Sequence, residues 1–240
     1  MARIIARDAD VFIGGRDVSG RSNSTTLTLS AEAPEVTSFG ETYRTRLASG
    51  IQDAELTVDG FFDSSASEVD ESFYAVLAGS VWCGMYPQDA TASHVGYEFG
   101  GILTNYEPAF AVADAAATSI TVTGACPVWA AKSLAYTTVS AVGSSQLTSV
   151  DFSGSGGTTY GVLRLLTLTG GGTPVFSASL QESTADVVWV TIAVLSGLTA
   201  ACQVQLSAAT SASRYRRVSA SLAGTSPCAT FMIASASVIN

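Results

Sequence analysis

The sequence predicts an all-β protein, because short runs of alternating apolar and polar residues are joined by turns rich in Gly, Ser and Thr. Apolar residues make up 47% of the 240 residues, which is enough for a sizeable core. Charged residues make up only 13%, so Ser, Thr, Ala and Gly have to cover the surface. Such a neutral surface is typical of subunits that are buried in an assembly, and also of extracellular β proteins.

In the first half of the chain the alternation predicts a series of strands. In Ile51–Phe62, Ala54, Leu56 and Val58 fall on one face, whereas Asp53, Glu55, Thr57 and Asp59 fall on the other. A strand with one face rich in carboxylates predicts an acidic side of its sheet if the neighbouring strands also carry acids. Further strands are expected at Asp8–Gly14, Ser24–Ala33, Val81–Tyr86, Tyr97–Ala111 and Thr118–Thr123, with a bulge or break at Gly100–Gly101.

One amphipathic helix is expected, at Ser67–Ala78. Ser67 is the expected N-cap, Asp70 stands at the capping-box position, and Gly79 follows the end. The apolar residues at helical spacing are Val69, Phe73, Val76 and Leu77. A single helix among strands is expected to pack this stripe across the face of a sheet or sandwich.

From about Lys132 the composition changes, because acids become rare and Ser, Gly and Thr dominate. Gly154–Gly157 and Gly170–Gly172 are expected to form turns. Short strands are expected at Ser144–Phe152, Tyr160–Leu168, Val175–Gln181, Val187–Val194, Cys202–Ser207, Tyr215–Leu222 and Ala229–Val238. This spacing predicts a β-sandwich of jelly-roll type, and a boundary near residues 126–135 gives two domains, residues 1–130 and 131–240.

The charge is distributed unevenly between these halves. Residues 1–130 contain 17 Asp and Glu against 6 Lys and Arg, whereas residues 131–240 contain 3 against 5. An acidic surface repels nucleic-acid phosphates, so it is unsuited to gripping DNA. It is suited to lining a passage through which DNA slides without binding.

Motifs of catalysis are absent from the sequence, and we predict neither an enzyme nor a cofactor or metal site. The single histidine, His94, lies in a polar loop and is expected at the surface. The cysteines are Cys83, Cys126, Cys202 and Cys228; they are either free thiols of a protein made in a reducing cytoplasm or one disulfide per half, Cys83–Cys126 and Cys202–Cys228. We expect no membrane span and no secretory leader in Met1–Asp10, because no long apolar run occurs.

The one basic cluster comprises Arg214, Arg216 and Arg217. Along a strand, Arg214 and Arg216 share one face and Arg217 lies on the other. Three arginines are too narrow a surface for nucleic-acid binding. They indicate either pairing with the acidic half of a neighbouring subunit or protection of an edge strand.

Residues 8–63 resemble the start of the tail tube (major tail) proteins of long-tailed bacteriophages. The resemblance is carried by the Gly14–Gly20 turn, by Thr37–Arg44, and by Gly50–Asp53 leading to Asp59–Asp63. In the second half, Val175–Ile192 and Arg214–Val238 resemble elements of discoidin-like, galactose-binding-type β-sandwich modules, but no ligand site is carried over.

The resemblance implies that the N-terminal half is a tail tube domain, a β-sandwich or barrel with one packed helix. Such domains self-assemble into hexameric rings, stacked head to tail around a tape measure protein. Such a tube meets tail terminator and tail tip proteins, is assembled in the host bacterial cytoplasm, and conducts DNA during ejection without specific binding. On this basis we predict that Asp53, Glu55 and Asp59 face the lumen. We predict inter-subunit contacts for Phe39, Tyr43, Arg44, Arg46, Arg214 and Arg216, with Gly40–Gly50 contacting a neighbouring ring or subunit.

Two other functions remain open at this point. A different virion part, such as a decoration or tail terminator protein, also forms rings or trimers but has no need of an acidic inner strand. A carbohydrate-binding adhesive module predicts exposed aromatic residues at loop tips, for which Tyr160 and Trp189 are the candidates.

Overall fold

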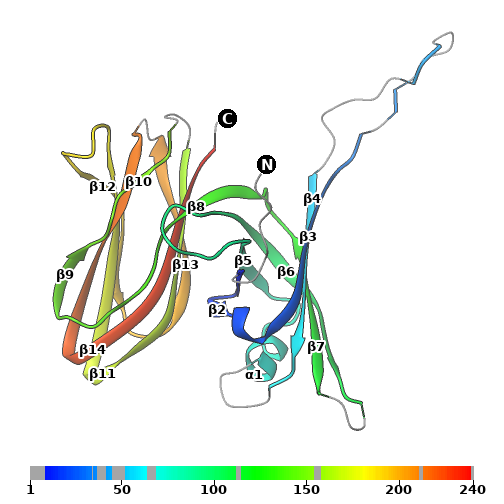
Figure 1. The fold of residues 1–240 in the computed structure, drawn as a ribbon, viewed down its shortest axis with the longest axis horizontal. Helices are drawn as coiled ribbons and strands as arrows, with labels where there is room; N and C mark the ends of the chain where they lie inside the picture. Colours follow the sequence, from blue (N-terminus) through cyan, green and yellow to red (C-terminus); the bar gives the residue numbers. More distant parts are fainter. Residues whose placement is uncertain are drawn as a thin grey trace. The chain divides into compact units, whose positions relative to one another are not determined.

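The computed structural model describes residues 9–33, 35–36, 42–44, 52–63, 69–111, 115–153, 158–210 and 213–238 (Figure 1). Antiparallel strands dominate these residues, which confirms the predicted all-β class. The chain forms two compact units. Unit 1 comprises Met1–Ser19, Trp82–Glu98 and Trp129–Asn240, and unit 2 comprises Gly20–Val81 and Phe99–Val128.

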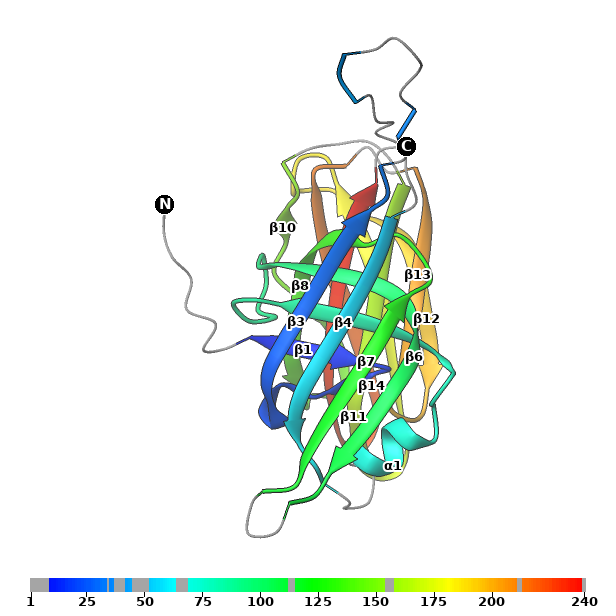
Figure 2. The same ribbon diagram turned by 90° about the vertical axis from the view of Figure 1, so that its right-hand side faces the viewer.

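Unit 2 contains a four-stranded antiparallel sheet in the order β3-β4-β7-β6, whose strands lie side by side in Figure 2. Their bounds are β3 Ser22–Ala31, β4 Gln52–Phe61, β6 Val95–Ala109 and β7 Ala117–Gly124. The predicted alternation in β4 is confirmed, because Ala54, Leu56 and Val58 are buried while Asp53 and Glu55 are exposed. Burial of one face fixes the register of such a strand, since a slip by one residue would expose its apolar set.

The helix α1 is shorter than expected and spans Val69–Tyr74. The predicted cap Ser67 lies outside the described residues. Phe73 is buried, but Val76 and Leu77 are 38% and 44% exposed, so the predicted stripe is wrong beyond Phe73. The chain leaves the helical path because Ala78, at a φ of 63°, donates its N–H to the carbonyl of Leu103 in β6.

Unit 1 is built around one long antiparallel pair, β11 (Thr158–Ser183) and β14 (Tyr215–Val238). The sequence predicted two strands in each of these segments. Instead both strands bend together and remain paired, with register shifts between Thr169 and Val175. Gly170, at a φ of 152°, permits the bend, because a Cβ there would come within 2.9 Å of the Cα of Pro227. The predicted Gly170–Gly172 turn is therefore a corner within a strand.

The bend divides unit 1 into two sheets. The first half of β11 pairs with β13, and the second half of β14 pairs with β8. The second half of β11 pairs with β12, and the first half of β14 pairs with β9 and β10. The bounds are β8 Trp129–Val139, β9 Gly143–Gln146, β10 Val150–Asp151, β12 Val190–Leu198 and β13 Cys202–Thr210.

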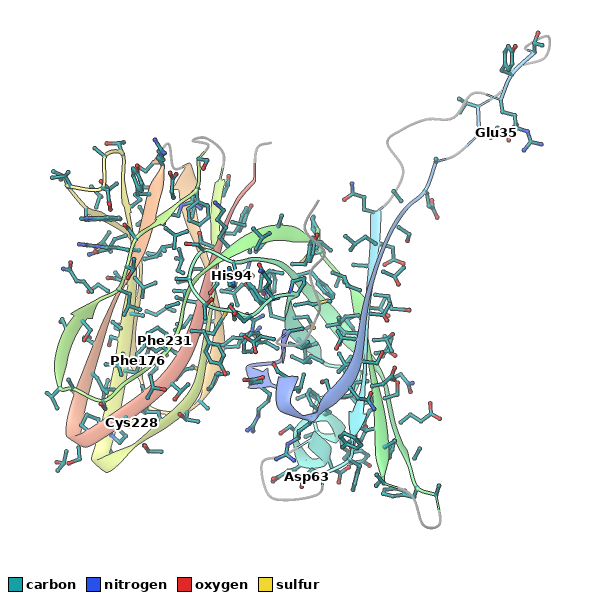
Figure 3. All side chains as sticks on the ribbon, in the orientation of Figure 1. Glu35, Asp63, His94, Phe176, Cys228 and Phe231 are labelled. Atoms are coloured by element: carbon teal, nitrogen blue, oxygen red, sulfur yellow. The ribbon has the colours of Figure 1, made fainter. Side chains whose placement is uncertain are left out.

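The apolar core of unit 1 lies between these two sheets. Phe176 and Phe231, which come from the two halves of the bent pair, are fully buried with ring centroids 4.9 Å apart. Figure 3 shows both rings among the sandwich strands. Leu163, Leu180 and Val218 belong to the same cluster. This packing produces the β-sandwich that the second half of the sequence predicted.

A further layer covers the outer face of the β13-β11-β14-β8 sheet. It contains β1 (Asp10–Ile13), the short β2 (Arg16–Asp17), β5 (Ser80–Tyr86) and the beginning of β6; the 3-10 turn η1 (Ser19–Arg21) follows β2. Phe12 and Tyr86 pack there with Trp129 and Met232. Strand β8 was missed in the sequence because both of its faces are largely covered, which removes a clear alternation.

The predicted division at residue 130 into a tail tube domain and a decoration domain stays a prediction. The structure shows that the compact units interleave along the chain, since β5 and β6 each begin in one unit and end in the other. At Gly100–Gly101, β6 changes its partner, from β8 up to Glu98 to β7 from Gly101 onward.

Candidate lumen surface

One face of the unit 2 sheet is rich in hydroxyl and carboxyl side chains, with Ile102 and Phe61 as exposed apolar residues on the same face. Its centre is the outward face of β4, which carries Asp53, Glu55, Thr57 and Asp59. Directly opposed residues in antiparallel strands share a face. The opposed residues are Ser30, Thr28, Thr26 and Ser24 in β3, and Thr123, Thr121 and Ser119 in β7.

Strand β6 adds a fourth carboxylate to this face. Glu107 is exposed and pairs with Ser119, which itself opposes Asp59. None of the four strands of the sheet contains Lys or Arg. The face therefore has four formal negative charges and no compensating cation within its own strands, so it repels phosphate groups.

Hydrogen bonds within the sheet hold part of this face in place. The hydroxyl of Ser119 donates to Oδ1 of Asp59 at 2.7 Å, and Asp59 is accordingly half-buried. The Thr104 and Thr123 hydroxyls lie 3.1 Å apart across β6 and β7. These hydrogen bonds fix the Asp59 carboxylate and the two threonine hydroxyls in place within the sheet.

The opposite face of the sheet is apolar and lies toward α1. Tyr106 shares this face with Ile120, and its hydroxyl donates to Oδ1 of Asp70 in α1 at 2.9 Å. Partial burial and the Asp70 carboxylate raise the pKa of Tyr106 to about 12. The acidic face is thus the side of the sheet that is turned away from α1.

The sequence correctly placed Asp53, Glu55 and Asp59 on one face, and their orientation toward a lumen stays a prediction. Glu107 was missed, because the extent of the alternation in β6 is obscured by a register shift between Leu103 and Asn105. Glu107 could have been predicted from the run Asn105–Tyr106–Glu107, in which the alternation of polar and apolar residues resumes after the bulge.

The predicted inter-subunit residues are spread over both units. Phe39 and Arg46 lie outside the described residues. Tyr43 is 84% exposed, and the side chain of Arg44 is 76% exposed with its Nη1 3.7 Å from Oε2 of Glu35. Their participation in subunit contacts stays a prediction.

Arg214 and Arg216 differ in environment although they were predicted to act together. Arg214 is exposed and forms a bidentate ion pair with Asp151, with a shortest distance of 2.5 Å. This pair holds the pKa of Asp151 at about 2. Arg216 is only 1% exposed and lies over the ring of Phe152, so it cannot reach a neighbouring subunit and we withdraw it from the contact set. Burial lowers the pKa of Arg216 to about 10.

Unit 1 contains a buried ion pair that the sequence analysis did not predict. The carboxylate of Glu98 accepts hydrogen bonds from Nη1 and Nη2 of Arg164 at 2.8 and 2.7 Å. It also accepts bonds from the hydroxyl of Tyr86 at 2.7 Å and from Nε1 of Trp82 at 3.0 Å. Burial acts to lower the pKa of Arg164, but the charge and hydrogen bonds of Glu98 raise it overall.

The geometry of this cluster indicates a structural role. Both charged side chains are at most 1% exposed, so the pair offers no access to a substrate. A Cβ on Gly84 would lie 2.5 Å from Oε1 of Glu98, which leaves no room for a ligand beside the carboxylate. The pair ties the beginning of β6 to β11, across 66 residues of sequence.

The remaining candidates for chemistry form no site. His94 lies in a surface turn, as predicted, with its Nδ1 2.5 Å from Asp89. The described residues contain no group of three or more His, Cys, Asp or Glu side chains arranged around a metal. All four cysteines are free, and burial raises the pKa of the Cys83 thiol. Within the described ranges, helices long and apolar enough to span a bilayer are not found.

The aromatic residues considered for sugar binding are already engaged. Tyr160 stacks on Trp129 with ring centroids 4.2 Å apart, inside the layer that covers the sandwich. Trp189 is half-buried and lies 4.2 Å from the guanidinium of Arg217. The two rings therefore do not form the exposed cluster at a loop tip that an adhesive module predicts.

No protein-family model and no curated protein match the chain. Among solved structures, a chain of the virion of a native gene transfer agent is 16% identical with a TM-score of 0.43, covering 53% of this chain and 97% of that one. The SPP1 Dit protein is 10% identical with a TM-score of 0.38, covering 97% and 100%. A chain of the phage p2 baseplate is 9% identical with a TM-score of 0.34, covering 88% and 97%. These scores are too low to establish a shared fold or function.

Proposed function

We propose that this protein is a structural subunit of a long-tailed bacteriophage tail, which self-assembles into stacked hexameric rings that form the tail tube. The observation that carries the proposal is the acidic, hydroxyl-rich face of the β3-β4-β7-β6 sheet, which contains no Lys or Arg. Facing the lumen, it repels the phosphates of DNA and lets the duplex slide during ejection.

The margins of the sheet suit ring closure. Among the described strands, β3 pairs only with β4, so the margin of the sheet along Thr25–Ala31 is an open template for another strand. Strand β6 lies at the other margin of the four; its backbone at Leu103 already bonds Ala78 and Gly79, so the stretch beyond Leu103 is the part that would accept another strand. When β3 of one subunit lies beside β6 of the next, the sheets join into one closed barrel and no edge remains.

The size of such a barrel fits a DNA conduit. Six copies of four strands, spaced about 4.8 Å apart and tilted by about 40°, give a backbone diameter of roughly 48 Å. Three copies would give about half that diameter, and the inward side chains would then fill most of the interior. Hexamers therefore leave an open channel wide enough for a duplex, and also for a tape measure protein during assembly in the host cytoplasm.

The experiment is negative-stain electron microscopy of the purified protein over a concentration series. Hollow tubes or stacked rings with a central pore support the proposal. Monodisperse subunits at every concentration, even with a molecular crowder, contradict spontaneous tube formation and favour a decoration protein. A glycan screen then tests the adhesive alternative.

The orientation of the acidic face is tested in the assembled tubes by charge reversal. Glu55→Lys places six additional cations in each ring of the lumen, so these tubes should retain short duplex DNA that wild-type tubes release. Glu71→Lys is the matched control, because Glu71 is exposed on α1, behind the other face of the sheet. If both variants retain equal amounts of DNA, the acidic face does not line the lumen.

A further inference from the structure

The sheet of unit 1 that contains β12, β9 and the neighbouring halves of β11 and β14 turns one face away from the sandwich core. Phe176, Leu180 and Val218 belong to the core, so the residues that alternate with them lie on the opposite face. Figure 1 shows β9 and β12 on the side of unit 1 opposite β2 and β5, whose layer covers the other sheet. This face is therefore the outside of the sandwich.

Small uncharged polar side chains lie side by side in the middle of this face. They form two rows across β9, β14 and β11, which are Ser144–Ser221–Ser177 and Gln146–Ser219–Ser179. The pairing of β11 with β14 has no register shift from Val175 to Ser183, so the two rows are in line. We call these residues the serine strip. Three strands give the strip a width of about 10 Å, and the face extends for about 20 Å along β14 from Arg217 to Ala223.

Most of the serine strip is available for hydrogen bonds to a ligand. Ser177 Oγ accepts a hydrogen bond from the N–H of Gly197 at 3.2 Å, and Ser179 Oγ donates weakly to the carbonyl of Ser219 at 3.5 Å. Within the part of the chain that the structure describes, the other side chains of the strip make no hydrogen bond; these are Ser144, Gln146, Ser219 and Ser221. A hydroxyl both donates and accepts, and the amide of Gln146 does the same. The strip thus offers donors and acceptors in a regular array.

The composition of the strip restricts the class of ligand. The nearest charge along β14 is Arg217, which already lies over the ring of Trp189 at 4.2 Å and donates to Gln181 at 2.8 Å. A highly charged ligand therefore finds no array of opposite charges here. Protein interfaces are depleted in serine, and an apolar partner would leave the covered hydroxyls without hydrogen bonds. The fitting ligand is uncharged and carries many hydroxyl or amide groups of its own.

An aromatic ring lies on the same face at one end of the strip. Tyr215 alternates with Arg217 along β14, is half-buried, and has its ring 5.1 Å from the guanidinium of Arg214. The carboxylate opposite Tyr215, that of Asp151, is already ion-paired with Arg214. A tyrosine joins an apolar ring to a polar tip, and a sugar likewise has C–H groups on its ring faces and hydroxyls at its rim. Because a flat strip cannot enclose a small ligand, it suits a chain of sugars rather than a single one.

We propose that the serine strip binds a neutral, linear polysaccharide of a cell surface, with the sugar chain lying along β14. The hydroxyl and amide groups of the strip bond to the hydroxyls of successive sugars, and the ring of Tyr215 packs against one of them. The site is the face of a sheet, which distinguishes it from the loop-tip site of an adhesive module. The inference goes beyond the proposed function, because a tail subunit with this property would also hold the particle at the cell surface.

The test is isothermal titration calorimetry of the full chain with maltohexaose, cellohexaose and N-acetylchitohexaose, and with hexagalacturonate as a charged probe. We expect at least one neutral hexasaccharide to bind with a Kd below about 1 mM, and hexagalacturonate to bind more weakly. Ser219→Ala/Ser221→Ala should weaken this binding by about tenfold or more, because each lost hydrogen bond weakens it by about fivefold. Ser24→Ala/Ser30→Ala is the matched control, since it removes two exposed hydroxyls from β3 in unit 2 and should leave the Kd unchanged.

Three results would overturn the inference. The first is that none of the neutral hexasaccharides binds. The second is that Ser219→Ala/Ser221→Ala binds as the wild type does, or that the control loses as much affinity, because the sugar then binds elsewhere. The third is that hexagalacturonate binds more tightly than the neutral probes, because the site then recognises charge. Single subunits and tubes can both be titrated, so a failure of the chain to form tubes refutes the proposed function and leaves this inference standing.

Discussion

Replacing Arg164 with methionine removes the counter-charge of Glu98 from the interior of unit 1. The carboxylate loses its two hydrogen bonds of 2.7 and 2.8 Å and keeps only those from Tyr86 and Trp82. Removing one partner of a buried ion pair costs about 3–5 kcal/mol of stability, because the remaining charge stays desolvated. Since two neutral donors still solvate Glu98, we expect a value near the lower limit, about 3 kcal/mol.

Urea unfolding at pH 7, followed by tryptophan fluorescence, measures this cost. The three tryptophans of the chain, Trp82, Trp129 and Trp189, all belong to unit 1, so the signal reports that unit alone. The double variant Glu98→Gln/Arg164→Met removes both charges and keeps an acceptor for the neutral donors, so it should be more stable than Arg164→Met. A loss below about 1 kcal/mol for Arg164→Met, or an equal loss in the double variant, would refute the reasoning.

Two further predictions concern the sandwich. Gly170→Ala should lower the stability by about 2 kcal/mol, because the φ of 152° is strained for alanine and the Cβ would meet Pro227 at 2.9 Å. Thermal unfolding followed by circular dichroism measures this loss. The control Gly20→Ala, with open space around its Cβ, should be close to neutral. The Asp151–Arg214 pair lowers the pKa of Asp151, so its stabilising contribution is complete above about pH 4 and is lost as the pH falls toward 2. The stability difference between wild type and Arg214→Ala should shrink over that window, and a difference that grows instead would contradict the assignment.

The parts of the fold that could be predicted are those in which one face of a strand is buried and the other is not. Ala54, Leu56 and Val58 alternate with Asp53 and Glu55, and this local pattern was enough to place the acidic face. Strand β8 has partners on both faces, so its sequence, Trp129–Val139, lacks such a pattern. Pairing between distant segments also explains why β11 is continuous. Its glycines at 170–172 predict a turn, but β11 pairs with β14 along its whole length and the strand therefore continues.

The buried ion pair could not be predicted because it depends on a contact between distant segments. Glu98 and Arg164 are separated by 66 residues, and nothing local distinguishes either from a surface charge except its position in an otherwise apolar run. Arg216 was misplaced for the same reason: alternation along β14 gives its face, but only the packing of Phe152 and Ser235 shows that this face is inside.

The threading of β5 and β6 through both units has a consequence for inheritance. A module attached by a single linker can be gained, lost or exchanged by one recombination event at that linker. Here the sandwich depends on β1, on the end of β5 and on the beginning of β6 as well as on residues 129–240. An exchange near residue 130 would replace residues 129–240 of the sandwich but keep β1, β5 and β6. These retained strands evolved with the original sandwich and would have to pack against a foreign one. The two units are therefore expected to diverge together, as one inherited block.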